Sequence, residues 1–413
     1  MHSARMTFEV TPEVHARMHE YFDKRIGQHL QRAEQRGLFA TYALGIVGEG
    51  ERKSVEPIAA RVTGDERTCK RMHDNLLHFI SRSPWSDRPV RREAAWYGIE
   101  ALQQQEPVTT WVVDDTGFLK QGTHSVGVQR QYTGSAGKIA NCQIGVSLSI
   151  ATRTEHMPID FALYLPESWT EDPARRKEAR IPDEVVFKTK IDLALDLIEQ
   201  AVVDEVPGEI VLADSGYGNS SDFRNVVRMY GLDIGVAIMA TTKVWLLDAG
   251  EETDGEPISV QKLGIELGLK SFRRITWREG TRRKMHSRFC FRRVKVANDD
   301  GTKAKDREPL WLMMEWPDGE EKPTKFILTS LPRRMTKKRI VRIIKERWRT
   351  ERVYEDLKGE LGLDHFEGRS FPGWYHHVTV VLCCYAFIVA ERVRHFPPSA
   401  GRSDRDETVG LAA

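Results

Sequence analysis

The strongest constraint on the fold is a change of pattern near Thr109 of the 413-residue chain. The preceding residues have helix-period apolar positions and few strand signals, which predicts a helical N-terminal domain over residues 1–105. After it, the segments TTWVVDDTG, NCQIGVSLSIAT and HMPIDFALYLP predict a three-stranded meander, and EIVLADSGYG predicts a strand that follows a helix. Strands that alternate with helices after an opening meander predict a mixed α/β sheet with helices on its faces.

The rest of the chain divides into a strand-rich part and a helix-rich part. Short apolar and aromatic runs predict a β-rich insertion over residues 241–331, which interrupts a core formed by residues 106–240 and 332–396. A long basic segment in this last part predicts one continuous helix, followed by a second, apolar helix. The polar tail over residues 397–413 is expected to be disordered. For the N-terminal helices, DNA binding and a role as a helical cap on the core both stay open.

Composition narrows the class of protein. The five cysteines are an odd set without paired metal-ligand spacing, so neither a disulfide framework nor a zinc ribbon is predicted. The N-terminus has no apolar secretory core, and the longest apolar stretch, 378–390, is too short to span a bilayer. We therefore expect a cytoplasmic protein that does not enter a membrane.

Positive charge is concentrated in two segments, although the net charge of the chain is only +2. Residues 270–295 hold eleven Lys and Arg side chains against one acid, and residues 333–349 hold nine against one. Such blocks indicate a polyanionic partner better than the total does. In the first block, basic and apolar residues alternate in strand fashion, which predicts one solvent-facing basic face along DNA. Its predicted DNA-binding residues are Arg288, Arg292 and Arg293.

Three acids stand where a sheet could bring them together. Asp115 ends the strand WVVDD, Asp214 ends EIVLAD, and Glu351 lies on the basic helix. Strand-end acids before Gly-bearing turns point into the crevice at the carboxyl edge of an α/β sheet. Neighbouring strand residues face opposite ways, so Asp114 and Asp115 cannot both serve one site, and Asp115 is favoured. Taken singly, each strand-end Asp is more often a turn or helix-capping residue.

The basic helix gives Glu351 a defined setting. At about 100° per residue, Arg347, Glu351 and Lys358 fall within about 40° of one another on a regular helix. Surface salt bridges alone would account for this stripe. A role as metal ligands would account for all three acids together. Two divalent metals held by converging carboxylates can activate a nucleophile and stabilise a leaving oxygen in phosphodiester cleavage. Oxygen ligands favour Mg²⁺, with Mn²⁺ as a substitute.

The segments VVDDTG, VLADSGYG and RWRTERVYEDLK, in this order, resemble the bacterial insertion-sequence transposases of the DDE class. They are most similar to the group with a Tyr-Arg-Glu-Lys signature, the IS-four superfamily, and within it to the IS-seven-zero-one branch. Arg347, Glu351 and Lys358 match the signature, whereas Ile344 stands at the place of its Tyr. The similarity extends over roughly residues 109–385.

The resemblance implies a ribonuclease-H-like core in which Asp115, Asp214 and Glu351 form the Mg²⁺-binding triad. Arg347, Lys358 and Trp348 are then expected to contact DNA near the cleaved end. The implied reaction is cutting of transposon ends and their joining to target DNA by two-metal phosphoryl transfer. The expected partner is double-stranded DNA, bound by a homodimer at the bacterial nucleoid. A domesticated, non-cutting DNA-binding regulator and an RNase-H-type nuclease are the alternatives.

Two pairs of residues outside the triad and the basic blocks are also candidates for a site. Arg130 and Lys138 flank a Gly-rich loop whose spacing is not that of a nucleotide-binding loop, and they are assigned to DNA contact, with a solvated loop as the alternative. His376 and His377 are adjacent on an apolar helix, where side chains diverge. Packing or capping is therefore predicted for them instead of a metal site.

Overall fold

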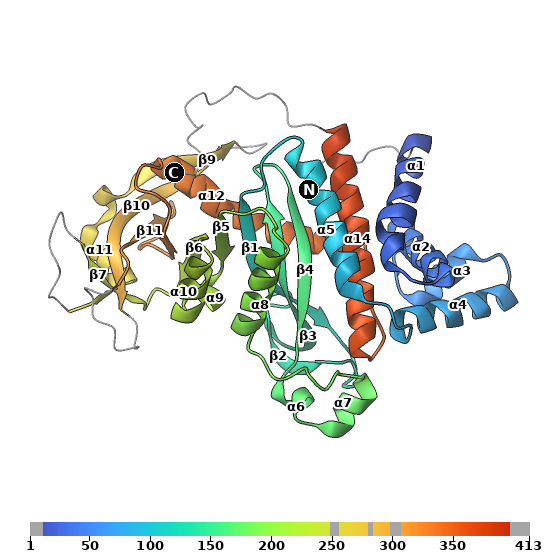
Figure 1. The fold of residues 1–413 in the computed structure, drawn as a ribbon. Helices are drawn as coiled ribbons and strands as arrows, with labels where there is room; N and C mark the ends of the chain where they lie inside the picture. The colour runs from blue at the N-terminus through green and yellow to red at the C-terminus, as the bar shows by residue number, and fades with distance from the viewer. Residues whose placement is uncertain (1–10, 248–255, 280–283, 298–306, 397–413) are drawn as a thin grey trace. The chain divides into compact units, whose positions relative to one another are not determined.

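The computed structural model describes residues 11–247, 256–279, 284–297 and 307–396 (Figure 1). Contacts divide the chain into two compact units. The first unit contains residues 1–108, 115–206 and 349–413, and the second contains residues 109–114 and 207–348. The N-terminal helices thus share a unit with part of the core, while the domain limits drawn from the sequence remain a prediction. The expected tail, 397–413, lies outside the described residues.

Helices form most of the first unit. The N-terminal segment contains α1 (Pro12–Glu20), a π-helical turn (Tyr21–Ile26), α2 (Ala33–Val47), α3 (Val55–Val62), α4 (Glu66–Ser81) and α5 (Asp87–Gln103). Later come α6 (Glu167–Thr170), α7 (Pro173–Ala179), α8 (Lys190–Val203), α13 (Arg349–Gly359) and α14 (Phe371–His395). Figure 1 shows α5 alongside α14, and α14 also packs on α2, α4 and strand β4. By length and composition α14 could cross a membrane, but 89% of its most apolar window is buried inside the protein. It is the central helix of this unit's core.

The sheet of the first unit is an antiparallel meander. It contains the second half of β1 (Thr110–Leu119), β2 (Gln129–Thr133), β3 (Lys138–Ala151) and β4 (His156–Tyr164). Strand β3 is bordered by β1 on one side, and it pairs antiparallel with β2 through its first residues and with β4 through the rest. Every residue of β3 from Cys142 onward is buried, as expected of a strand covered on both faces.

The sheet of the second unit begins with the first half of β1, which pairs parallel with β5 (Ile210–Ala213), itself parallel to β6 (Asp233–Ile238). The predicted insertion continues this sheet from β6 through antiparallel strands. These are β12 (Lys325–Thr329), β11 (Leu310–Trp316), β10 (Lys284–Ala297), β9 (Arg273–Glu279), β7 (Lys243–Leu246) and β8 (Ile258–Ser259). The helices of the unit are α9 (Ser215–Gly218), α10 (Ser221–Met229), α11 (Val260–Leu267) and α12 (Lys337–Lys345).

The predicted mixed α/β fold is confirmed. Strand β1 opens an antiparallel meander in one unit and pairs with parallel strands in the other, which is the strand arrangement expected of a ribonuclease-H-like core. The insertion is β-rich as predicted, although it also contains α11, which the sequence pattern did not reveal.

One predicted helix is corrected. The basic segment is not continuous, because a 3₁₀ turn over Glu346–Trp348 separates α12 from α13. A mid-helix 3₁₀ stretch tightens the backbone, so the regular stripe through Arg347, Glu351 and Lys358 is interrupted before Glu351. Glu351 and Lys358 still share one stripe, because both lie in α13, seven residues apart.

Candidate active site

Asp115 lies in the second half of β1, in the first unit, and its side chain meets a lysine. The Lys190 ammonium, at the first residue of α8, donates to Oδ2 of Asp115 at 2.9 Å. Thr189 caps this helix in a reciprocal pair with Asp192, which explains why α8 begins here. The side chain of Asp115 is 26% exposed. It is therefore accessible and already faces a cation.

Residues next to Asp115 point to the other face of the strand. The Phe118 ring packs edge-on against Trp374 of α14 and lies 5.4 Å below the Lys358 ammonium. Because side chains alternate along a strand, Asp114, Thr116 and Phe118 share this face and Asp115 faces away from it. The expectation that the two acids serve different environments is met by this geometry.

Asp114 belongs to the second unit and has its own partner. It accepts a hydrogen bond from Nη1 of Arg347 at 2.9 Å and is only 14% exposed. In the parallel pair of β1 and β5, Val113 stands opposite Ala213. Continuing that register by one residue sets Asp114 level with Asp214, on the same side of the sheet. The sequence pattern could not show this register. Asp114 and Asp115 must therefore both be tested as the metal ligand on β1.

Asp214 directly follows β5 and caps the short helix α9. Its Oδ1 accepts a hydrogen bond from the Gly216 amide at 2.8 Å. The segment DSGYG, which contains Asp214 and α9, needs glycine at position 218. A Cβ there would lie 2.0 Å from the Ala237 carbonyl oxygen of β6. The capping role that we considered as the ordinary alternative is thus present, and it leaves the half-buried carboxylate at the carboxyl end of a parallel strand.

Glu351 is exposed in the first turn of α13. The opposite side of this helix is buried through Thr350, Val353, Tyr354 and Leu357. The Tyr354 hydroxyl meets the Ser147 hydroxyl of β3 at 2.6 Å, which fixes the helix to the sheet of the first unit. The buried side anchors α13 and leaves the Glu351 carboxylate available to a ligand.

Lys358 connects α13 to the strand that carries Asp115. Its ammonium donates to the Gly117 carbonyl at 2.7 Å and to the Ser135 hydroxyl at 3.1 Å. Burial lowers the pKa of Lys358 below its ordinary value. Within the first unit, Lys358 therefore binds the backbone of β1 at Gly117, two residues after Asp115, on the face opposite the Asp115 side chain. A positive charge there favours an incoming anion.

The three predicted acids are divided between the units, with Asp115 and Glu351 in the first and Asp214 in the second. In the described part of the chain, no group of three or more His, Cys, Asp or Glu side chains is arranged to hold a metal ion. The convergence of the triad therefore remains a prediction.

The remaining residues that the sequence predicts to contact DNA have different surroundings. Arg130 and Lys138 are exposed on the hairpin of β2 and β3. Arg347 pairs with Asp114, as described above. Trp348 is 42% exposed, and the Arg278 guanidinium lies 4.6 Å from the centre of its ring.

The single basic face expected for β10 is not formed. Arg288 pairs with Asp318, Arg292 donates to the Phe291 carbonyl, and Arg293 donates to a backbone carbonyl and lies over Trp311. All three arginines are half-buried. Arg292 and Arg293 are adjacent, so they point to opposite faces of the strand. The alternating pattern was real, but it could not show that both faces of β10 are covered.

Sequence reasoning missed a basic groove in the second unit. It is lined by residues of the edge strand β9 and of α12, and the charged side chains among them are Arg274, Arg278, Lys338 and Arg342. Each of these residues belongs to one of the two basic blocks of the sequence, so charge density was the available signal. The pairing of α12 with β9 could not be read from the sequence, because it joins segments about sixty residues apart.

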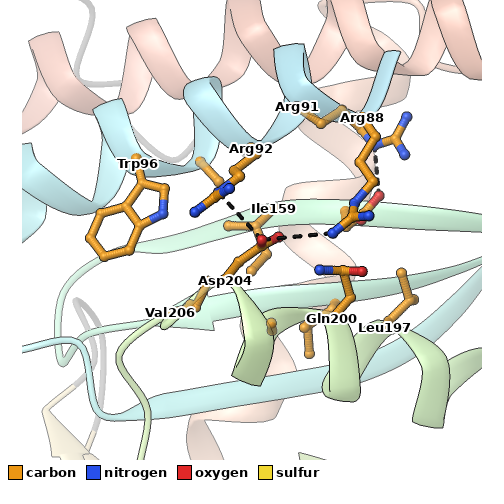
Figure 2. A pocket seen from close by; sticks show the side chains of 13 residues that line it. Arg88, Arg91, Arg92, Trp96, Ile159, Leu197, Gln200, Asp204 and Val206 are labelled. Carbon is orange, nitrogen blue, oxygen red and sulfur yellow. Dashed lines mark ion pairs between the residues drawn. The ribbon is translucent and has the colours of Figure 1, made fainter. Parts of the chain in front are cut away.

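A small cavity in the first unit lies away from all predicted site residues. It measures about 30 Å³, between α5, α8 and the sheet (Figure 2). Figure 2 shows Arg88 and Arg92 of α5 directed at Asp204, beyond the end of α8. Beside it, the buried Arg91 pairs with Asp160 of β4 at 2.7 Å. The cavity is too small for a nucleotide. Its ion pairs attach α5 to the end of α8 and to β4.

Known protein families match most of the chain. The model described as "DDE superfamily endonuclease" matches residues 25–284, and the one described as "Transposase DDE domain" matches residues 183–387. The first match covers more than half of the chain, so the protein belongs to the DDE superfamily endonucleases. Members of this class depend on divalent metal ions.

Among curated proteins, the chain is similar to the "Probable transposase for insertion sequence element IS701" of Microchaete diplosiphon. The two are 27% identical over 205 residues, which is 49% of this chain and 49% of the relative. The similarity thus spans about half the length of that protein. Among solved structures, a piggyBac transposase synaptic complex with hairpin DNA matches with a TM-score of 0.44 and 11% identity, over 92% of this chain and 73% of that one. A score this low carries no conclusion about this chain.

Proposed function

We propose that the protein is a DNA transposase that cuts transposon ends and joins them to target DNA by metal-dependent phosphoryl transfer. The observation that supports this most strongly is the link, inside one unit, between Asp115 on β1 and the helix of Glu351 through Lys358. An endonuclease family model covers that strand, and a transposase family model covers that helix.

The proposed ligands fit a divalent metal. All three are carboxylates, which suit Mg²⁺ and accept Mn²⁺ in its place. Asp115 already meets the Lys190 ammonium, so its carboxylate lies where a cation is accommodated. When bound, the metals would activate the attacking oxygen and stabilise the leaving one.

The chain's own side chains then position the substrate. Lys358 lies beside Gly117 and over Phe118, on the face of β1 opposite the Asp115 side chain, where it would hold a backbone phosphate. The basic groove of β9 and α12 would bind DNA further away in sequence-independent fashion. We further propose assembly as a homodimer on two DNA ends and a location in the cytoplasm at the nucleoid.

The test uses a duplex that carries the inverted repeats flanking the gene, incubated with Mg²⁺. We expect the wild-type protein to nick the repeat ends and Glu351→Gln to bind with unchanged affinity and lose nicking. Tight binding without cleavage by the wild type would identify a regulator instead. Cleavage of RNA–DNA hybrids without any need for the repeats would identify an RNase-H-type nuclease.

A further inference from the structure

The hairpin of β2 and β3 exposes an apolar pair that the rest of the fold does not use. Tyr132 and Ile139 are direct cross-strand partners, and their side chains are 64% and 60% exposed. Partners in an antiparallel pair point to the same face, so the two side chains form one continuous apolar surface. Large exposed apolar groups that adjoin one another indicate a contact surface.

The turn of this hairpin is fixed next to Asp115. The Ser135 hydroxyl lies 3.3 Å from the Thr116 hydroxyl, accepts from the Gly117 amide at 3.3 Å, and accepts from the Lys358 ammonium at 3.1 Å. Thr116 and Gly117 directly follow Asp115. The turn of the hairpin is therefore held in place beside the two residues of β1 that follow the proposed metal ligand.

The charge of the hairpin selects the kind of partner. Residues 129–142 contain two cations, Arg130 and Lys138, and no acid. Both cations are exposed, and Arg130 shares the face of Tyr132 because it lies two residues before it. A partner must therefore offer negative charge together with apolar faces. Nucleic acid offers both, as phosphates and as the faces of sugars and bases.

The turn also leaves room for close approach. A side chain added at Gly134 or Gly137 would meet no atom within 4 Å, so this side of the turn is open. Gly137 adopts a positive φ of 63°, which a residue with a side chain rarely does. The small residues keep the turn thin where a DNA backbone would pass.

We propose that this hairpin is a DNA-contacting element that packs Tyr132 and Ile139 against sugars or bases of the transposon end, beside the strand to be cut. The proposal rests on the proposed function, because it assumes that Asp115 belongs to the cutting site. It adds to that function a contact made by apolar side chains. This contact is made with sugars or bases, whereas the basic residues contact phosphates.

The test compares the double variant Tyr132→Ala with Ile139→Ala against the wild type. Binding of a fluorescent duplex with the inverted repeat is measured by anisotropy without divalent metal, over a series of salt concentrations. We expect affinity to fall about tenfold, in the range of one lost stacking contact. The salt slope should stay unchanged because apolar contacts release no counterions, whereas Arg130→Ala should reduce the slope by about one. Val203→Ala, which alters another side chain of this unit that is 66% exposed, serves as the matched control and should bind as the wild type does.

The proposal is overturned if the double variant binds within twofold of the wild type while both keep the same melting temperature. It is also overturned if sedimentation shows that the variant loses self-association and keeps its DNA affinity, because the surface then serves a second copy of the chain. A wild-type protein that does not bind the duplex at all would contradict the proposed function itself. The two failures are thereby distinguishable.

Discussion

At the scale of single residues, the two neighbouring acids of β1 have different partners, and this difference makes a prediction. Asp115 faces Lys190, whereas Asp114 is held by Arg347. If Asp115 is the metal ligand, Asp115→Asn should reduce cleavage of the repeat duplex by at least about a thousandfold, because a metal ligand acts only in the chemical step. Asp114→Asn should keep cleavage within about tenfold. The opposite outcome would assign the first ligand to Asp114, as the register with Asp214 suggests.

A second prediction at this scale concerns acid stability. Burial lowers the pKa of His377 to about 4, and its Nε2 contacts the Gly362 carbonyl while Nδ1 meets the Tyr42 hydroxyl. The unfolded chain takes up this proton near pH 6.5 and the folded chain only near pH 4. Stability is therefore full above pH 6.5 and is lost as the pH falls toward 4, on the order of 3 kcal/mol from this residue.

The measurement is urea unfolding of the wild type and His377→Gln between pH 4.5 and 8. The variant should be less stable at pH 7 but show a shallower decline toward acid. His156, whose pKa burial lowers to about 3, contributes a decline common to both proteins. An identical pH slope for the two proteins would show that His377 does not titrate as described.

At the scale of secondary structure elements, α5 is attached to the sheet of the first unit by a buried ion pair. Arg91 is almost fully buried between Asp87 and Asp160, and Arg88 on the same helix is about half exposed. Arg91→Ala would leave Asp160 buried without its partner and should lower the free energy of unfolding by about 3–5 kcal/mol. Arg88→Ala is the matched control and should cost less than about 1 kcal/mol. Equal losses in chemical denaturation would contradict the attachment.

Elements were predictable from the sequence where local signals agree. The run EIVLAD ends in an acid before turn residues, and β5 ends there as predicted. The run WVVDD also gave its strand, but β1 continues through DDTG to Leu119, so Asp115 lies within the strand and the prediction that it ends the strand was wrong. The prediction that His376 and His377 pack inside is confirmed, since both are buried and hydrogen-bonded to protein groups. The 3₁₀ turn after Lys345 was not predictable, because ERW contains neither Pro nor Gly and fits a helix by composition.

What the sequence could not provide was the pairing of distant segments. The choice between Asp114 and Asp115 depends on the register of β1 with β5, which is set by tertiary packing. The sequence pattern predicts that the arginines of β10 form a solvent-facing strand face. In the structure, α12 covers one side of this strand, where Lys337 lies over Phe291 and Lys345 lies over Phe289. Ser135 drew no notice because a serine in a Gly-rich turn has no distinctive spacing.

At the scale of the whole molecule, the proposed function combines carboxylates that would hold metal ions with a basic groove that would bind DNA. The Glu351 helix is fixed to the Asp115 strand in one unit, and the other unit carries Asp214 and the basic groove. Catalysis of this type requires that DNA binding and metal binding both be present when the strand is cut. We accordingly propose that Asp115, Asp214 and Glu351 ligate common metal ions on DNA.

The most direct measurement is Mn²⁺ binding to the complex of protein and repeat duplex, followed by electron paramagnetic resonance. We expect tight sites in the wild type, with spin coupling between two ions about 3.5–4 Å apart. We also expect that Asp115→Asn, Asp214→Asn and Glu351→Gln each abolish this coupling while DNA affinity is kept. Full, coupled Mn²⁺ binding in Asp214→Asn or in Glu351→Gln would contradict the shared site.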